Sequence, residues 1–183
     1  MCQYHPMSIK ENKKAWLSDA HWKLVQESVP IVCVDLLPIR VSRRNPHSVE
    51  AIGLILRDTP HQGQRWCLIG GRLLYRESVQ DAISRQVAET LGSQTRIRPG
   101  RNHHPICIAQ YSPRRTKHFS LDPRQHAVSL TYVLELTGWA APQGEAVSYE
   151  WFDVKKLPPP KAFGFDQSRL VKHCLRRLRS AAI

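Results

Sequence analysis

Two glycines and a row of polar side chains at helical spacing form the stretch of this sequence best suited to chemistry. The glycines at 70–71 follow the apolar run WCLI, and Arg85, Gln86, Glu89 and Thr90 come after a loop. On a helix, Arg85 and Glu89 lie within about 40° of each other, with Gln86 and Thr90 on the same flank. Because that flank faces back toward the glycines, backbone groups, a guanidinium and a carboxylate are expected to meet around one small volume.

The helix that must position these side chains is marked by its two ends and by one apolar stripe. Ser78 is suited to cap the free N–H groups of the first turn, and Asp81 completes a capping box. Gly92 stands where the helix would stop. Apolar residues recur every four positions on the face that a domain would bury: Val79, Ile83, Val87 and Leu91.

The stretch 70–92 resembles a Nudix box, whose family pattern is G-x5-E-x7-R-E-U-x-E-E-x-G-U, with U an apolar residue. Six residues stand at the family's spacing: Gly71, Glu77, Arg85, Val87, Glu89 and Gly92. The box is degenerate, because Gln86 and Thr90 replace glutamates and Ser93 replaces an apolar residue. The resemblance implies the Nudix fold, an α/β/α sandwich around a mixed β-sheet.

The resemblance also implies a divalent metal site, because the family's glutamates hold Mg²⁺ or Mn²⁺ against a pyrophosphate. Its expected ligands here are Glu89, the backbone carbonyl of Gly71, and Glu145. Glu145 is included because many Nudix enzymes place a further metal-binding carboxylate six residues before a Trp, which here is Trp151. Gln86 offers only a neutral oxygen and cannot accept a proton from water at neutral pH. The metal site is therefore expected to be weaker than the family's usual one.

The other members of the expected catalytic group come from the box and from a later loop. The resemblance implies that Arg85 neutralises charge on the leaving group and that Glu77 has a structural role in orienting Arg85. The long polar loop at 112–126 carries Arg124, a candidate clamp for phosphate, and His126, the candidate general base because of its pKa range.

Within the superfamily, the segments VQESVPIVCVDLLPIR, LILR and WCLIGGR resemble the GDP-mannose mannosyl hydrolase type. In that type an aspartate on the first strand and two arginines contact the sugar nucleotide, which implies substrate-binding roles for Asp35, Arg57 and Arg72. A second resemblance covers 16–178 and is to a Nudix-related family of unnamed activity, with a box ending in ETLG and a DPRQH loop.

Alternating and β-branched runs predict the strands of the sheet, and capped amphipathic runs predict two further helices. Asp166 is expected to cap the final helix, which has an apolar face and a basic remainder. The expected helices are a short one capped by Ser18 or Asp19 and running through Val25, and the final one after residue 166; the expected strands are 31–37, 51–57, 66–69, 106–111 and 128–136.

Length and composition indicate one globular domain, expected at 16–183 after a flexible lead-in at 1–15, since the 183 residues are 42% hydrophobic. No apolar run is long enough to span a bilayer and no signal peptide is evident, so we expect no membrane association and a cytoplasmic location. Five cysteines without a CxxC pair indicate reduced thiols. The net charge of +12 favours anionic partners.

Three functions follow from these observations. The first is a metal-dependent Nudix-type hydrolase of a nucleoside-diphosphate-linked or related organic pyrophosphate. The second is a catalytically weak or inactive Nudix-fold module that binds nucleotides, as the loss of two box glutamates suggests. The third is a basic nucleic-acid-binding protein, for which the charge is the sole support. The sequence leaves the oligomeric state open, a dimer included.

Overall fold

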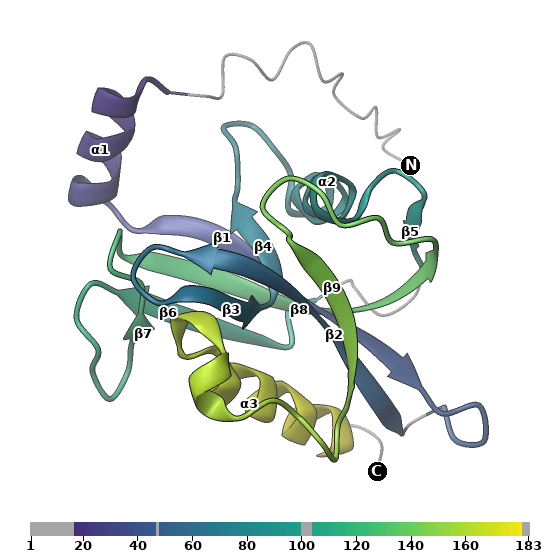
Figure 1. Cartoon of the computed structure of the whole chain (residues 1–183). Coiled ribbons are helices and arrows are strands. Elements are labelled where there is room, and N and C mark those ends of the chain that lie inside the picture. The colour runs from purple at the N-terminus through teal and green to yellow at the C-terminus, as the bar shows by residue number, and fades with distance from the viewer. Residues whose placement is uncertain (1–16, 47, 100–103, 181–183) are drawn as a thin grey trace.

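The chain folds into a mixed β-sheet with helices on both faces (Figure 1). The computed structural model describes residues 17–46, 48–99 and 104–180, and the lead-in expected at 1–15 lies outside these ranges. The elements are α1 (Asp19–Ser28), β1 (Ile31–Val41), β2 (Val49–Thr59), β3 (Gly63–Cys67), β4 (Ile69–Arg72), α2 (Val79–Leu91), β5 (Thr95–Ile97), β6 (Cys107–Ser112), β7 (Ser120–Leu121), β8 (Ala127–Gly138), β9 (Ser148–Asp153), two short 3₁₀ helices, η2 (Pro160–Ala162) and η3 (Gly164–Asp166), and α3 (Gln167–Ser180).

Strand β1 is the centre of the sheet, whose main order is β3-β2-β1-β8-β6-β7. It runs parallel to β8 from Ile31 to Ile39, while its other edge pairs first with β4, up to Leu36, and then with β2, from Ile39 onward. Pro38 lies between these two pairings, where its missing N–H costs neither partner a ladder hydrogen bond. β4 and β2 therefore share one edge of β1. β4, which carries the two glycines, pairs with the part of this edge that β2 leaves unpaired.

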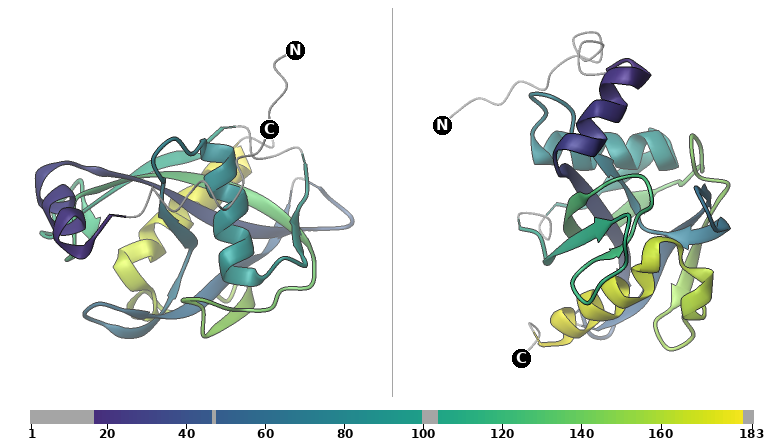
Figure 2. Two further views of the ribbon diagram at one scale, coloured as in Figure 1. Left: turned by 90° about the horizontal axis from the view of Figure 1, so that it is seen from above. Right: turned by 90° about the vertical axis from the view of Figure 1, so that its left-hand side faces the viewer.

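The helices α2 and α3 cover opposite faces of the sheet, as Figure 2 also shows. The stripe predicted for the box helix packs on one face with Val34 and Leu36 of β1, and Val171, Cys174 and Leu175 of α3 pack on the other face. The expected α/β/α sandwich is confirmed.

Local signals predicted two helix caps but missed several helix and strand ends. Helix α1 ends at Ser28 rather than Val25, and the strand expected at 66–69 is divided between β3 and β4. Ser78 caps α2 and Ser18 caps α1, as expected, but β1 and β2 are longer than predicted and the loop at 112–126 contains β7. Asp166 does not have the extended backbone of an N-cap residue, because its φ is 57° and its carboxylate pairs with Arg115 at 2.9 Å. The backbone of η3 therefore decides where α3 begins.

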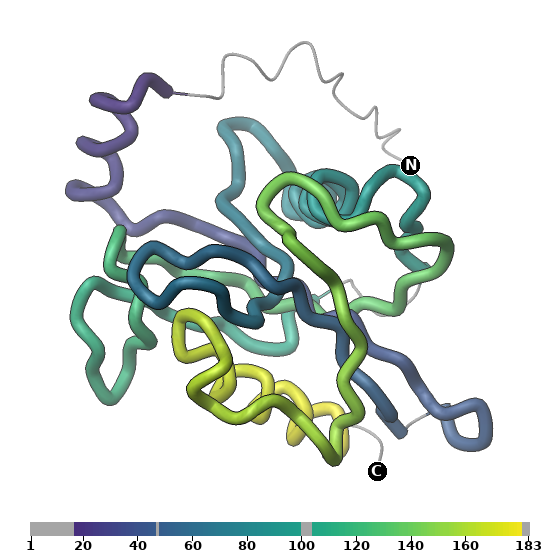
Figure 3. The backbone as a smooth tube through the Cα atoms, viewed as in Figure 1, coloured from purple at the N-terminus to yellow at the C-terminus, as the bar shows by residue number. Residues whose placement is uncertain are grey.

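Helix α1 lies at the end of the sheet where β8 begins (Figure 3). The backbone N–H of Ile31 donates to the carbonyl of His126 at 2.9 Å, which joins the start of β1 to the segment preceding β8. In the described part of the chain, no helix is long and apolar enough to cross a membrane.

Candidate functional site

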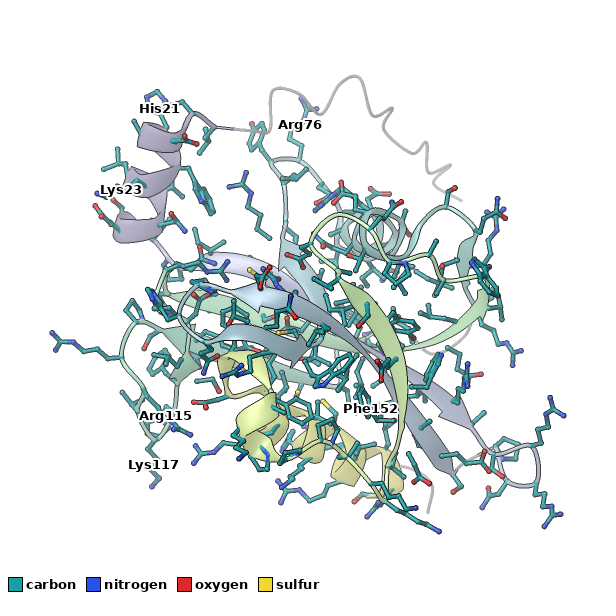
Figure 4. All side chains as sticks on the ribbon, viewed as in Figure 1. His21, Lys23, Arg76, Arg115, Lys117 and Phe152 are labelled. Carbon is teal, nitrogen blue, oxygen red and sulfur yellow. The ribbon has the colours of Figure 1, made fainter. Side chains whose placement is uncertain are left out.

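A cleft of about 1020 Å³ opens where the box, the start of β1 and helix α1 come together. The segments that line it are far apart in the sequence: α1, β1, β2, β3, β4, α2, β6, the loop before β8, β8, the loop before β9, η3 and the start of α3. The side chains filling this region are drawn in Figure 4. The lining includes nine predicted site residues: Asp35, Arg57, Gly71, Arg72, Arg85, Gln86, Glu89, Arg124 and Glu145.

Glu77 and Arg85 form the internal frame of the box. Arg85 Nε lies 2.6 Å from Glu77 Oε1, and Arg85 Nη2 donates both to Glu77 Oε2 at 2.9 Å and to the backbone carbonyl of Arg72 at 3.0 Å. Glu77 Oε2 also accepts the N–H of Leu74 at 2.9 Å. Burial lowers the pKa of Arg85, but Glu77 and Glu89 outweigh it and raise that pKa. The pairing matches the structural role implied for Glu77.

Gln86 takes part in this frame through its amide. In the orientation that satisfies its neighbours, the amide nitrogen donates to the Gly70 carbonyl at 3.1 Å and the oxygen accepts from Arg85 Nη1 at 2.9 Å. A Cβ at position 71 would collide with this amide, which explains the glycine there. Thr90 is buried on the same flank, with 2% of its surface exposed. Both replacements are thus accommodated by packing and hydrogen bonding.

Two carboxylates remain at the edge of the cleft, and each is paired with an arginine. Glu89 Oε2 lies 3.0 Å from Arg85 Nη1, and Glu145 Oε2 lies 2.7 Å from Arg57 Nη1. The pKa of Glu145 is raised by burial. The positive charges of Arg57 and Arg124 oppose this rise, and the negative charge of Glu89 adds to it. The two glutamates are therefore near enough to repel each other, and a cation between them would relieve the repulsion.

These donors fit a divalent metal only in part. Within the described ranges, no group of three or more His, Cys, Asp or Glu side chains is placed to hold a metal ion. Mg²⁺ is, however, commonly bound through one or two carboxylates together with substrate phosphates and water. Glu89 and Glu145 fit an ion of that kind, held jointly with a ligand, better than a site closed by the protein alone.

Four arginines face the cleft, and aromatic rings hold three of them. Arg57 and Arg124 lie over the ring of Phe165, at 5.8 and 5.1 Å from its centroid. Arg72 lies 3.9 Å from the ring centroid of Trp22. Burial, and then the neighbouring charge of Arg85, lower the pKa of Arg72. Like charges held together in this way favour a bound anion.

Asp35 lies at the floor of the cleft and is 8% exposed. Tyr111 donates its hydroxyl to Asp35 Oδ2 at 2.8 Å, and Gln167 Nε2 lies 3.5 Å from the Tyr111 oxygen. Burial raises the pKa of Asp35, and the Tyr111 hydrogen bond only partly opposes this. Tyr111, from β6, is therefore the hydrogen-bond partner of this buried acid.

His126 is the predicted catalytic residue that does not line the cleft. Its ring packs edge-on against Phe119, with centroids 5.3 Å apart, and its Nε2 is buried without a hydrogen-bond partner. The loop that carries it instead brings Arg124 to the cleft, fixed by Asp122 through contacts of 2.9 Å to Nε and Nη2. The geometry therefore gives His126 no route to a substrate in the cleft.

The sequence interpretation missed several cleft residues. Trp22, Tyr111, Gln125, Phe165 and Gln167 were given no role in the site. The available signal was the tryptophan itself, a large aromatic residue in a short helix that also carries charged and polar residues.

Residues 12–176 match a protein family described as a domain of unknown function (DUF4916). The chain belongs to this family. A curated relative is an ADP-ribose pyrophosphatase from Methanocaldococcus jannaschii, which is 26% identical over 121 residues, or 66% of this chain and 62% of the relative. The chain thus spans less than two thirds of that relative's length.

Solved structures place this DUF4916 chain among Nudix folds. A possible asymmetric diadenosine tetraphosphate hydrolase from Jonesia denitrificans is 29% identical with a TM-score of 0.72, covering 82% of this chain and 96% of its own. The Nudix domain of NrtR from Shewanella oneidensis, solved with ADP-ribose, is 16% identical with a TM-score of 0.56, covering 88% and 99%. The Nudix fold is confirmed, and the relatives named as pyrophosphatase and hydrolase agree with the expectation of an enzyme of that kind.

Proposed function

We propose that this chain binds a nucleoside-diphosphate-linked compound in the cleft and hydrolyses its pyrophosphate linkage. The observation that supports the proposal most is the convergence of four arginines and two carboxylates on one cleft: Arg57, Arg72, Arg85, Arg124, Glu89 and Glu145. Guanidinium groups bind phosphate oxygens in a bidentate way and would neutralise charge as the linkage breaks. The pyrophosphatase and hydrolase relatives favour the same substrate class.

Mg²⁺ or Mn²⁺ fits the proposal as a partner of the substrate. Glu89 and Glu145 would hold the ion, with the Gly71 carbonyl as a further candidate ligand. When bound, it would polarise a phosphoryl oxygen and lower the pKa of a coordinated water. The side chains have their own roles: Arg57 and Arg124 bind one phosphate, and Arg72 binds the other. Arg85, whose N–H groups are taken up by protein partners, contributes positive charge beside Arg72. Because β1 delivers Asp35 to the floor of the cleft, a sugar nucleotide such as GDP-mannose belongs to the class to be tested.

A nucleotide-binding module without turnover is the second candidate, and Gln86 is the observation that favours it. Its amide is fully used in joining Gly70 to Arg85, so this position supplies neither a metal ligand nor a base. The cleft would then keep its affinity for diphosphates while hydrolysis is lost. Nothing in the cleft favours the nucleic-acid candidate, which rests on net charge.

Turnover of a substrate panel separates the two candidates. ADP-ribose, GDP-mannose and diadenosine tetraphosphate are incubated with the chain and Mg²⁺ or Mn²⁺, and phosphate-containing products are measured. We expect one class to be hydrolysed and Glu89→Gln to reduce kcat by about 100-fold or more. The matched control is Glu150→Gln, an exposed glutamate on β9 outside the cleft. A nucleotide that raises the melting temperature without being consumed would favour the binding module.

A further inference from the structure

Helix α1 is attached to the domain in an unusual way, because none of its residues is buried. Leu24 on this helix is 62% exposed, and Lys23 lies on the side of α1 that faces away from the sheet (Figure 4). The helix contributes nothing to either apolar core cluster. Its indole side chain, at Trp22, is half-buried and lines the cleft. Core packing therefore does not explain why this large aromatic residue stands here.

Two contacts orient α1 toward the cleft. The guanidinium of Arg72 lies 3.9 Å from the centroid of the Trp22 ring, and Gln26 Nε2 donates to Gln125 Oε1 at 2.9 Å. Both partners belong to the walls of the cleft, one from β4 and one from the loop before β8. The indole is thereby held as part of one wall.

The indole lies directly beside the cationic part of the cleft. Arg72, which stacks on it, accepts a hydrogen bond from Arg85 through its backbone carbonyl at 3.0 Å. An aromatic surface next to two neighbouring arginines matches the order of groups in a nucleoside diphosphate, where a flat base is followed by a ribose and then by two phosphates. A cleft of about 1020 Å³ has room for all three parts.

We propose that Trp22 is the residue on which the nucleobase of the ligand stacks, with Arg72 linking this subsite to the diphosphate; the inference rests on the function proposed above. Every base has a π-face, so stacking on an indole gives affinity without selecting one base strongly. Arg72 strengthens the subsite, because a guanidinium stacks on an aromatic face and binds phosphate through its donors. The ligand class is thus a nucleoside diphosphate joined to any further group.

Two probes that differ only by the nucleoside test this inference. Titration calorimetry on the full chain compares α,β-methylene-ADP with methylenediphosphonate, both resistant to hydrolysis. We expect Trp22→Ala to weaken α,β-methylene-ADP by about 5- to 150-fold, the range found for bases stacked on aromatic side chains. Binding of methylenediphosphonate should weaken far less, because it loses only the ring that holds Arg72. Trp22→Phe should keep most of the affinity for the nucleotide while removing the tryptophan fluorescence quenching that the base produces in the unaltered chain.

Trp139→Ala is the matched control, because this tryptophan is 75% exposed and does not line the cleft. It should leave the affinity for both probes unchanged. Equal loss of the two probes in Trp22→Ala would overturn the inference, since Trp22 would then act only by holding Arg72. Unchanged binding of α,β-methylene-ADP would overturn it as well. If the unaltered chain binds methylenediphosphonate no more weakly than α,β-methylene-ADP, the inference of a base subsite is wrong, but the proposed binding of diphosphates is not. If the unaltered chain binds neither probe, the proposed function is wrong as well.

Discussion

Arg85 and Glu77 form a two-pronged ion pair inside the box, with contacts of 2.6 Å between Nε and Oε1 and 2.9 Å between Nη2 and Oε2. The side chains are only 16% and 4% exposed. The pair closes the loop between β4 and α2, because Glu77 also accepts from the backbone of Leu74. The loop and helix that contain Glu77 and Arg85 are therefore held together by charge.

We expect Arg85→Ala to destabilise the fold by about 3–5 kcal/mol, because it leaves the buried Glu77 carboxylate without its partner. Chemical denaturation followed by circular dichroism measures the loss. Lys23→Ala is the control, since it breaks an exposed pair with Glu27 whose contact is 4.0 Å, and it should cost less than about 1 kcal/mol. Similar losses for the two variants would show that the Arg85 pair has no special structural weight.

Restoring the family's glutamate with Gln86→Glu should destabilise the metal-free protein by about 1 kcal/mol or more. The amide that donates to Gly70 would be replaced by a carboxylate facing a carbonyl oxygen in a position only 8% exposed. Added Mg²⁺ should recover the melting temperature of this variant more than that of the unaltered chain, because a cation between the oxygens removes their repulsion.

The control for that experiment is Gln94→Glu, an exposed position after α2. Its melting temperature should respond to Mg²⁺ as the unaltered chain does. An identical response to Mg²⁺ in Gln86→Glu and Gln94→Glu would mean that the box no longer places position 86 near a metal.

Asp35 should make the stability of the protein fall as pH rises. Its folded pKa is raised by burial above the value in the unfolded chain, about 3.9. The contribution of the neutral carboxyl is complete below that unfolded pKa and is lost as pH rises through the folded pKa. Asp35→Asn removes this titration, and the amide oxygen can still accept the hydrogen bond from Tyr111. The free energy of unfolding of the variant minus that of the unaltered chain should therefore increase from pH 4 upward.

Denaturant titrations at several pH values measure that difference. Asp58→Asn, at an exposed position of β2, is the control, and the difference for Asp35→Asn should change with pH more than the difference for this control. A difference for Asp35→Asn that changes no more than that of the control would mean that the buried acid does not change its charge between the two states.

Cys107 should be the most reactive thiol among the described cysteines near neutral pH. Its Sγ lies 3.7 Å from that of Cys174, and this hydrogen bond is the main cause that lowers the Cys107 pKa to about 7. Burial raises the pKa of Cys33 and of Cys67 to about 12. Iodoacetamide labelling mapped by mass spectrometry should therefore modify Cys107 first, with a rate that rises through pH 7.

Cys174→Ala removes the hydrogen bond and should move the midpoint of that rate profile upward, toward the ordinary thiol value. The same variant with Cys107 also replaced by Ala should lose the fast label altogether. A profile that does not move in Cys174→Ala would contradict the assigned cause of the shift.

Patterns within short segments were enough to predict the box helix. The stripe of apolar residues every four positions, the cap at Ser78 and the stop at Gly92 all describe interactions between residues a few positions apart, which a sequence displays directly. Five strands were predicted, but β5, β7 and β9 were not, and the expected strand 66–69 is divided between β3 and β4. Strand ends were also missed, since strand length depends on the neighbour with which each strand pairs.

Only the tertiary structure decided which distant side chains share the cleft. Glu145 meets Arg57 because the backbone N–H of Val147 donates to the carbonyl of Leu56, where β9 begins to pair with β2. His126 and Arg124 lie two residues apart, yet one turns to Phe119 and the other faces the cleft.

The physical reason is register. Residues two apart in a strand point to the same side, but Arg124 lies in a turn before β8, so its side chain and that of His126 diverge. The pairing of strands far apart in the chain then fixes where that turn stands relative to the cleft. The same reason kept Trp22 hidden from sequence reasoning, because its place beside Arg72 depends on how α1 meets the edge of the finished sheet.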